Sequence, residues 1–179
     1  MIKSSGTKKS PFNIVFGLIV FLVIGALLFK PLLKCFFPVK YINIIQKYSN
    51  EYNLDEYLVM AVIRTESKFK EDAVSSKDAK GLMQLKEETA TWCMDKFDIS
   101  SDGDIMHPET NIRIGCAYLR YLLDKFGDEK TALAAYNAGE GNVTKWLENK
   151  NSLEPIPFEE TKNYVELVQD REKIYRFLY

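Results

Sequence analysis

The sequence predicts a mainly α-helical domain with at most a small sheet, preceded by one transmembrane helix. Residues 14–29 form an uninterrupted apolar run without a charge. Beyond Lys40, apolar residues recur at the three- and four-residue spacing of amphipathic helices. No series of segments shows the apolar–polar alternation that is typical of strands. The 179 residues suffice for one medium domain with an appendage.

The N-terminal part divides into a tail and an apolar segment. Residues 1–11 are polar and basic, and we expect a disordered cytoplasmic tail there. With its flanks, the apolar segment covers residues 12–37 and reaches the roughly 20 residues that a helix needs to cross a bilayer. It is longer than a typical signal-peptide core and has no small-x-small cleavage site, so we predict an uncleaved anchor, with a cleaved signal peptide as the alternative. Pro31 and Pro38 are expected to stop or kink the helix at the membrane surface.

Residues 41–179 are predicted to form the helical domain. Its helix ends are indicated by capping residues: Asn53 or Asp55 at one start, Asp128 at another, and Gly127 at an end. The apolar positions of the last helix, which runs from about residue 161, are predicted to face inward at Val165, Val168, Ile174 and Phe177. Six helices are predicted before it. They cover residues 41–48, the segment from the cap at 53 or 55 to 66, about 87–97, 112–126, the segment from the cap at 128 to near 139, and 143–147.

Charge and metal-binding side chains exclude several classes of protein. The first 40 residues contain six lysines and no acid, whereas the rest holds 18 basic against 25 acidic side chains. An acidic body without a basic stripe argues against nucleic acid as a partner. The single histidine, His107, excludes the usual zinc amidases and endopeptidases, whose sites need at least two histidines. Cys35, Cys93 and Cys116 lack CxxC spacing, so we expect interfacial or buried thiols.

Four short segments carry the side chains that indicate a catalytic site. In chain order they are Glu66-Ser67, Gly81-Leu82-Met83-Gln84-Leu85, Ala135-Tyr136-Asn137-Ala138-Gly139 and Glu160-Thr161-Lys162-Asn163-Tyr164-Val165. Their order and spacing closely resemble the lytic transglycosylases of the soluble, Slt-like kind, which belong to the goose-lysozyme-like group. The resemblance runs from about Tyr41 to the C-terminus, and it implies a lysozyme-like catalytic fold for residues 41–179. The chain departs from the family pattern at Asp78-Ala79-Lys80, at Lys86-Glu87 and at Lys162.

Glu66 is the expected catalytic residue. It ends an apolar helix, where the negative end of the helix dipole favours a neutral carboxyl group, and enclosure by Met83 and aromatic rings would raise its pKa further. The resemblance implies that Glu66 first protonates the oxygen between N-acetylmuramic acid and N-acetylglucosamine. It then accepts the proton of the muramoyl C6 hydroxyl, which attacks C1 and closes a 1,6-anhydro ring. No metal and no cofactor are implied.

The resemblance also implies a set of residues that bind the substrate. Met83 and Gln84 would line the cleft, and Tyr136 would be a platform for a sugar ring. Asn137 would bond substrate through its amide, and Tyr164 would aim its hydroxyl at the catalytic carboxyl or the acetamido group. The full expected set is Ser67, Gly81, Met83, Gln84, Tyr136, Asn137, Ala138 and Tyr164.

The expected function is therefore a membrane-anchored peptidoglycan lytic transglycosylase. Its substrate lies outside the cytoplasmic membrane, which places the catalytic domain on the extracytoplasmic side of a single-pass membrane protein. The expected partners are the glycan strands, the bilayer through residues 12–37, and other cell-envelope proteins. One alternative is a catalytically silent wall-binding module of an envelope complex. The other is a hydrolytic muramidase, whose water would be held by Asp72, Asp78, Glu87, Glu88 or Asp104.

Overall fold

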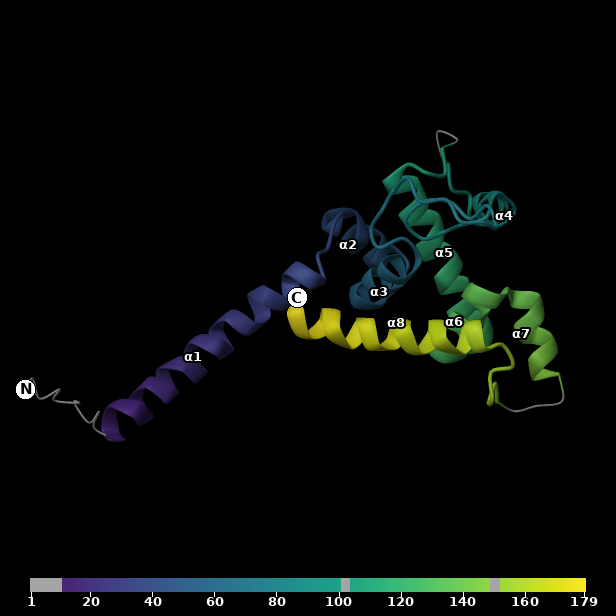
Figure 1. Ribbon diagram of the computed structural model, residues 1–179. Helices are drawn as coiled ribbons and strands as arrows, with labels where there is room; N and C mark the ends of the chain where they lie inside the picture. Colours follow the sequence, from purple (N-terminus) through teal and green to yellow (C-terminus); the bar gives the residue numbers. More distant parts are fainter. Residues whose placement is uncertain (1–10, 101–103, 149–151) are drawn as a thin grey trace, which may run out of the picture. The chain divides into compact units, whose positions relative to one another are not determined.

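The computed structural model describes residues 11–100, 104–148 and 152–179, and the chain separates into two compact units (Figure 1). The N-terminal unit contains one helix, α1 (Pro11–Phe36). Residues Val15–Phe36 of this helix are long and apolar enough to cross a membrane, a test that a signal sequence near the N-terminus also passes. Helix α1 continues through Pro31, so Pro31 does not stop it, and the alternative expectation of a kink stays a prediction. The helix ends two residues before Pro38, as expected, because a proline disfavours the helical conformation in the residue before it.

The second unit is helical, which confirms the predicted fold class. No strand forms among its described residues, and the only extended pairing there consists of two isolated bridges, Val74 with Lys80 and Lys80 with Leu85. The seven helices of this unit are α2 (Ile42–Glu51), α3 (Glu56–Glu66), α4 (Glu87–Phe97), α5 (Pro108–Phe126), α6 (Glu129–Ala138), α7 (Glu140–Leu147) and α8 (Glu159–Leu178).

The helix ends follow local capping chemistry. The Asp55 carboxylate accepts a hydrogen bond from the Tyr57 amide at 2.8 Å and caps α3. Gly127 ends α5 with φ +77°, a backbone conformation that glycine adopts without strain. Asp128 then caps α6 by accepting from the Thr131 amide at 2.9 Å. Each of these caps was predicted, because an N-cap or C-cap depends on only a few neighbouring residues.

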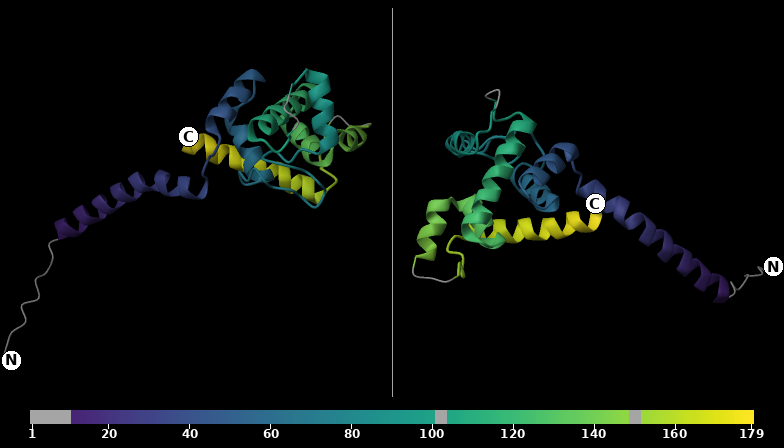
Figure 2. Two further views of the ribbon diagram at one scale, coloured as in Figure 1. Left: turned by 90° about the horizontal axis from the view of Figure 1, so that it is seen from above. Right: turned by 180° about the vertical axis from the view of Figure 1, so that it is seen from behind.

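Helix α5 is the centre of the packing. It contacts α2, α4 and α6, and α8 runs along the domain beside α6 and the start of α3 (Figures 1 and 2). Val165, Val168 and Tyr175 of α8 are buried, whereas Phe177 is 51% exposed, so the prediction that Phe177 faces inward is wrong. The reason is helical phase: Tyr175 lies two turns after Val168 on the same face, whereas nine residues place Phe177 on the opposite face.

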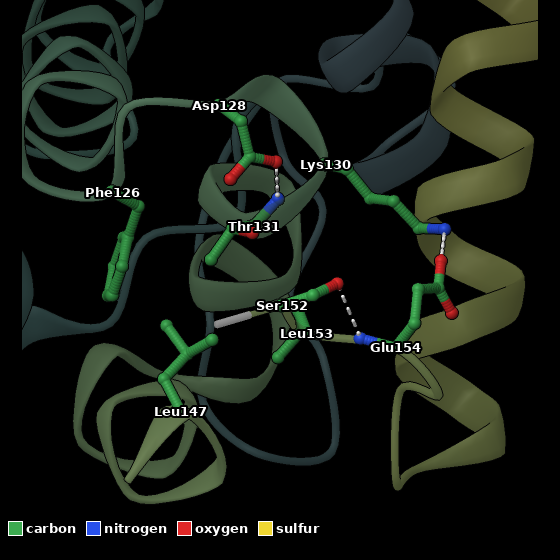
Figure 3. Close-up of a pocket in the computed structure, with 8 residues that line it drawn as sticks. All are labelled: Phe126, Asp128, Lys130, Thr131, Leu147, Ser152, Leu153 and Glu154. Carbon is green, nitrogen blue, oxygen red and sulfur yellow. Dashed lines mark hydrogen bonds and ion pairs between the residues drawn. The ribbon is translucent and has the colours of Figure 1, made fainter. Parts of the chain in front are cut away.

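The segment before α8 packs against the start of α6 around a small pocket (Figure 3). Leu153 is buried there, and the Lys130 ammonium group pairs with the Glu154 carboxylate. In the same domain Cys93 and Cys116 are fully buried, and burial raises the pKa of the Cys93 thiol to about 12. These two cysteines are therefore packing residues with unreactive thiols, as the sequence predicts.

Candidate active site

Glu66, the last residue of α3, lies at a surface pocket. All side chains from Leu58 to Ile63 of α3 are buried, so the helix is fixed in the core. The helix stops at Glu66 because Lys68 and Phe69 turn the backbone into the left-handed region, with φ of 54° and 63°. Phe69 is 2% exposed and holds this turn against the domain. The Glu66 side chain, half-buried, is left at the edge of the core.

The pocket has a volume of about 490 Å³. Its walls come from the turns around residues 75–86, from the start of α4, from Tyr118 of α5, and from the end of α6. Five of the nine predicted site residues line it: Glu66, Gln84, Tyr136, Asn137 and Ala138. The other lining residues are Ser75, Ser76, Lys77, Ala79, Leu85, Lys86, Glu88, Thr89, Tyr118, Gly139 and Glu160.

A buried amide, Asn111, holds the turn that forms one wall. Its Oδ1 accepts a hydrogen bond from the Met83 amide at 2.7 Å, and its Nδ2 donates to the carbonyls of Lys80 at 3.0 Å and Ile105 at 2.7 Å. Gly81 has φ +76° and packs so closely on Asn111 that an added Cβ would meet Nδ2 at 2.3 Å. Gly81 is therefore required by this packing, and it does not line the pocket.

The prediction that Met83 lines the cleft is wrong. Its main-chain N–H and carbonyl are held by Asn111 and by the Tyr136 hydroxyl, which directs the side chain into the core. There Met83 is fully buried in the space left by Gly115, where a Cβ would lie 2.3 Å from the methionine sulfur. The next residue, Gln84, takes φ +49° and does line the pocket. Its Nε2 donates to the carbonyls of Ala73 at 3.0 Å and Gly81 at 2.8 Å, which orients the amide.

The end of α6 contributes an aromatic wall and an oriented amide. The Tyr136 hydroxyl donates to the Met83 carbonyl at 2.8 Å, and the Tyr136 ring lies 5.5 Å from the ring of Tyr118. The Asn137 Oδ1 accepts a hydrogen bond from the Thr161 hydroxyl at 2.9 Å. Because its carbonyl oxygen is engaged, Asn137 presents its N–H₂ group as a donor to a ligand in the pocket.

The Glu66 carboxyl has the electrostatics of a proton donor. Burial raises its pKa to about 7, so the neutral acid is well populated near neutral pH. The neighbouring Tyr164 hydroxyl opposes this rise. Tyr164 is buried, and its hydroxyl makes no hydrogen bond of good geometry with any described group. Tyr164 therefore lies beside the carboxyl, and its hydroxyl can still accept or donate a hydrogen bond.

Ser67 lies behind the pocket and does not line it. Its side chain is buried, and its hydroxyl donates to the Ile63 carbonyl at 3.2 Å, so its local contact is with the helix end. Of the five carboxylates considered as holders of a hydrolytic water, only Glu88 lines the pocket. Glu160, which is not one of these five carboxylates, also lines it.

Three residues that build the site had no role in the sequence-based prediction. Thr161 orients Asn137, Tyr118 adds a second ring beside Tyr136, and Asn111 holds the turn. Thr161 lies in the last of the four segments that carry the family resemblance, so its position there indicated a place in the site. Asn111 and Tyr118 lie in the segments Asn111-Ile112 and Tyr118-Leu119, which the family resemblance also covers, but no role was assigned to either residue.

The chain is similar to known proteins over most of its length. The family model described as "Transglycosylase SLT domain" matches residues 43–158. The chain belongs to this family. Over 152 residues it is 38% identical to the soluble lytic murein transglycosylase of Escherichia coli (strain K12), covering 79% of this chain and 24% of that protein. It is 29% identical over 167 residues to the membrane-bound lytic murein transglycosylase C of Serratia proteamaculans (strain 568), covering 76% of this chain and 47% of the relative.

Solved structures of this family share the fold. An inactive mutant of the lytic transglycosylase Slt from Pseudomonas aeruginosa superposes with a TM-score of 0.74 at 36% identity, covering 80% of this chain and 25% of that one. A complex of the 70 kDa soluble lytic transglycosylase with bulgecin A gives a TM-score of 0.73 at 38% identity, covering 79% and 25%. The chain thus spans about a quarter of the length of these transglycosylases, and the match falls on its SLT domain.

Proposed function

We propose that this chain is a peptidoglycan lytic transglycosylase that cleaves the bond between N-acetylmuramic acid and N-acetylglucosamine without water. The observation that carries the proposal is the position and the pKa of the Glu66 carboxyl. This group lines a pocket formed by the SLT-type segments, and its pKa is raised to about 7. A carboxyl with this pKa donates a proton at neutral pH and, once ionised, accepts one. One residue can therefore serve both halves of the reaction.

In the proposed reaction, Glu66 protonates the glycosidic oxygen as the bond to C1 breaks. The resulting carboxylate takes the proton of the muramoyl C6 hydroxyl, whose oxygen then bonds to C1. The products are a 1,6-anhydromuramoyl end and a free hydroxyl on the leaving sugar, and Glu66 is again protonated. Asn137 and Gln84 supply amide groups toward the sugar substituents, and Tyr136 and Tyr118 supply ring surfaces. Tyr164 is placed to hydrogen-bond Glu66 as its charge changes.

The direct test is incubation of the full-length protein, in detergent, with purified sacculi. We expect soluble glycan fragments to accumulate with time. Binding of the protein to sacculi without any release of fragments would support the silent wall-binding module instead.

We further propose that α1 anchors the enzyme and that the SLT domain lies on the extracytoplasmic side. The support is the apolar length of Val15–Phe36 and the likeness to transglycosylases whose names describe them as membrane-bound. The expected substrate is also found only outside the cytoplasmic membrane. A topology reporter fused after Tyr179 should be active outside the cytoplasm. Activity only inside would contradict the orientation, and release of a shortened chain from membranes would support a cleaved signal.

The rate of cleavage should fall as the pH rises through about 7. Burial has raised the pKa of Glu66, so the protonated form that starts the reaction dominates below this value and is lost above it. We expect kcat/KM on soluble glycan strands to lose about tenfold per pH unit well above the pKa. A profile recorded between about pH 5 and pH 9 measures it. A rate that climbs between pH 6 and pH 8 would contradict Glu66 as the initial acid.

Replacing Thr161 by valine should weaken substrate binding more than turnover. Valine matches threonine in shape but removes the hydrogen bond that orients Asn137. Loss of one such bond costs about 0.5–1.5 kcal/mol, so we expect KM to rise about two- to tenfold with kcat nearly unchanged. Thr161→Ser keeps the hydroxyl and should retain a KM near that of the wild type. Equal effects of both substitutions on KM would show that packing, not the hydrogen bond, is responsible.

A further inference from the structure

A row of aromatic rings leads from the candidate active-site pocket to the surface of α4. Tyr136 and Tyr118 line the pocket with ring centroids 5.5 Å apart, and the ring of Trp92 follows 6.3 Å from Tyr118. Trp92 is 39% exposed. We propose that Trp92, Tyr121 and Lys96 form a second carbohydrate-binding site, the distal subsite, which holds the glycan strand beyond the pocket. This inference rests on the proposed function, because it extends the same cleft.

Helix geometry makes the distal subsite a continuation of the pocket wall. Glu88 and Thr89 of α4 line the pocket, and Trp92 lies four and three residues after them, one turn further on the same helix face. On α5, Tyr118 lines the pocket and Tyr121 lies three residues later. Each helix thus has a ring one turn beyond its pocket-lining residues, and these rings meet: Trp92 and Tyr121 have centroids 4.9 Å apart.

The side chains of the distal subsite suit an acidic glycan. Exposed aromatic faces bind the apolar face of a pyranose ring. The Lys96 ammonium group lies 5.2 Å from the Trp92 ring centroid and 5.1 Å from that of Tyr121. It places a cation where the carboxylates of muramoyl residues and their stem peptides would pass. The site thus offers a surface for the sugar and a counter-charge for its substituents.

Tyr121 is held in place from the pocket side. Its hydroxyl donates to the Glu140 carboxylate at 3.1 Å, and the Lys125 ammonium group pairs with the same carboxylate. Glu140 directly follows Gly139, which lines the pocket. The ring is therefore fixed before a ligand arrives, which reduces the entropy lost on binding.

Trp92 also packs α4 on α5, so the test must separate packing from binding. A packing residue would change stability and affect substrates of every length alike. A subsite residue would affect only strands long enough to reach it. We expect Trp92→Ala to lower kcat/KM about three- to tenfold on long glycan strands and to leave the shortest cleavable strands unaffected, whereas Trp92→Phe keeps most of the long-strand rate. Equal losses at all lengths, or no loss at any, would overturn the distal subsite.

A binding measurement keeps the proposal testable if Trp92→Ala folds poorly. The chain has only two tryptophans, Trp92 and Trp146. Trp146 packs on Phe158 with centroids 4.8 Å apart, and neither of these two residues lines the pocket. In a protein carrying Trp146→Phe and Glu66→Gln, fluorescence reports Trp92 alone and cleavage is blocked. Long strands should change the Trp92 emission at lower concentration than short strands do. No change with long strands that do bind would overturn the subsite. If the wild type neither binds nor cleaves strands of any length, the proposed function itself fails.

Discussion

Replacing Glu66 by glutamine is expected to lower the rate of glycan cleavage by at least about 10²–10⁴-fold, the usual contribution of a general acid or base. The amide matches the carboxyl in shape, so the packing around it should hold, but it cannot deliver a proton. Because Glu66 is proposed to act as acid and then as base, both halves of the reaction lose their catalyst. Release of soluble fragments from sacculi measures the loss.

The matched control is Glu56→Gln, at the other end of the same helix. It removes one carboxylate from α3 without touching the pocket lining, and we expect activity within about twofold of the wild type. Undiminished cleavage by Glu66→Gln, or an equal loss in the Glu56 variant, would contradict the assignment of Glu66.

The stability of Glu66→Gln at different pH values tests whether burial raises the pKa of Glu66. A carboxyl whose pKa is higher in the folded chain than in the unfolded chain favours folding most at low pH, and it destabilises the fold as the pH rises from about 4.5 through about 7. Glutamine has no charge to bury. The melting temperature of Glu66→Gln, relative to the wild type, should therefore increase between about pH 5 and pH 8. This comparison also establishes that an inactive variant is folded.

The second large effect is expected from Asn111→Ala, which should lower the free energy of unfolding by about 3–5 kcal/mol. The substitution leaves three backbone groups without their hydrogen bonds: the Met83 amide and the carbonyls of Lys80 and Ile105. Buried groups of this kind cost about 1–3 kcal/mol each when unsatisfied, and water entering the new space would recover part of that. Denaturant unfolding of the full chain in detergent measures the change.

Asn111→Ala should also impair the site from a distance. The turn that it holds carries Gln84 and the Met83 carbonyl, which accepts the Tyr136 hydroxyl. Asn43→Ala, an exposed substitution in α2, is the matched control and should change stability by less than about 0.5 kcal/mol. A loss for Asn111→Ala no larger than for this control would show that the turn is held by other contacts.

Much of the helical framework could be predicted because it depends on nearby residues. Asp55, Gly127 and Asp128 set helix ends through contacts within three or four positions. The apolar spacing correctly predicted that Val165 and Val168 of α8 are buried. Where a single residue was placed wrongly, as with Phe177, the periodic pattern was extended one step too far along a helix that is buried on a narrow face.

The packing behind the pocket could not be predicted from local sequence patterns. Asn111 and Gly81 meet across 30 residues of sequence, and that contact decides where the Met83 side chain goes. The pKa of Glu66 likewise depends on how fully the domain encloses it, which no short segment specifies. The resemblance supplied the identity of the pocket residues, whereas the division between residues that line the pocket and residues that stand behind it required the tertiary structure.

The most direct test of the central claim is the mass of the new glycan ends that the wild-type protein produces from purified sacculi. Transfer of the muramoyl C6 oxygen to C1 consumes no water, so we predict 1,6-anhydromuramoyl ends, each lighter by one water than a reducing end. Mass spectrometry of the soluble fragments distinguishes the two. Fragments that carry only reducing muramoyl ends would contradict the account and would assign the chain to hydrolysis, with Glu88 or Glu160 as the carboxylate placed at the pocket to hold the water.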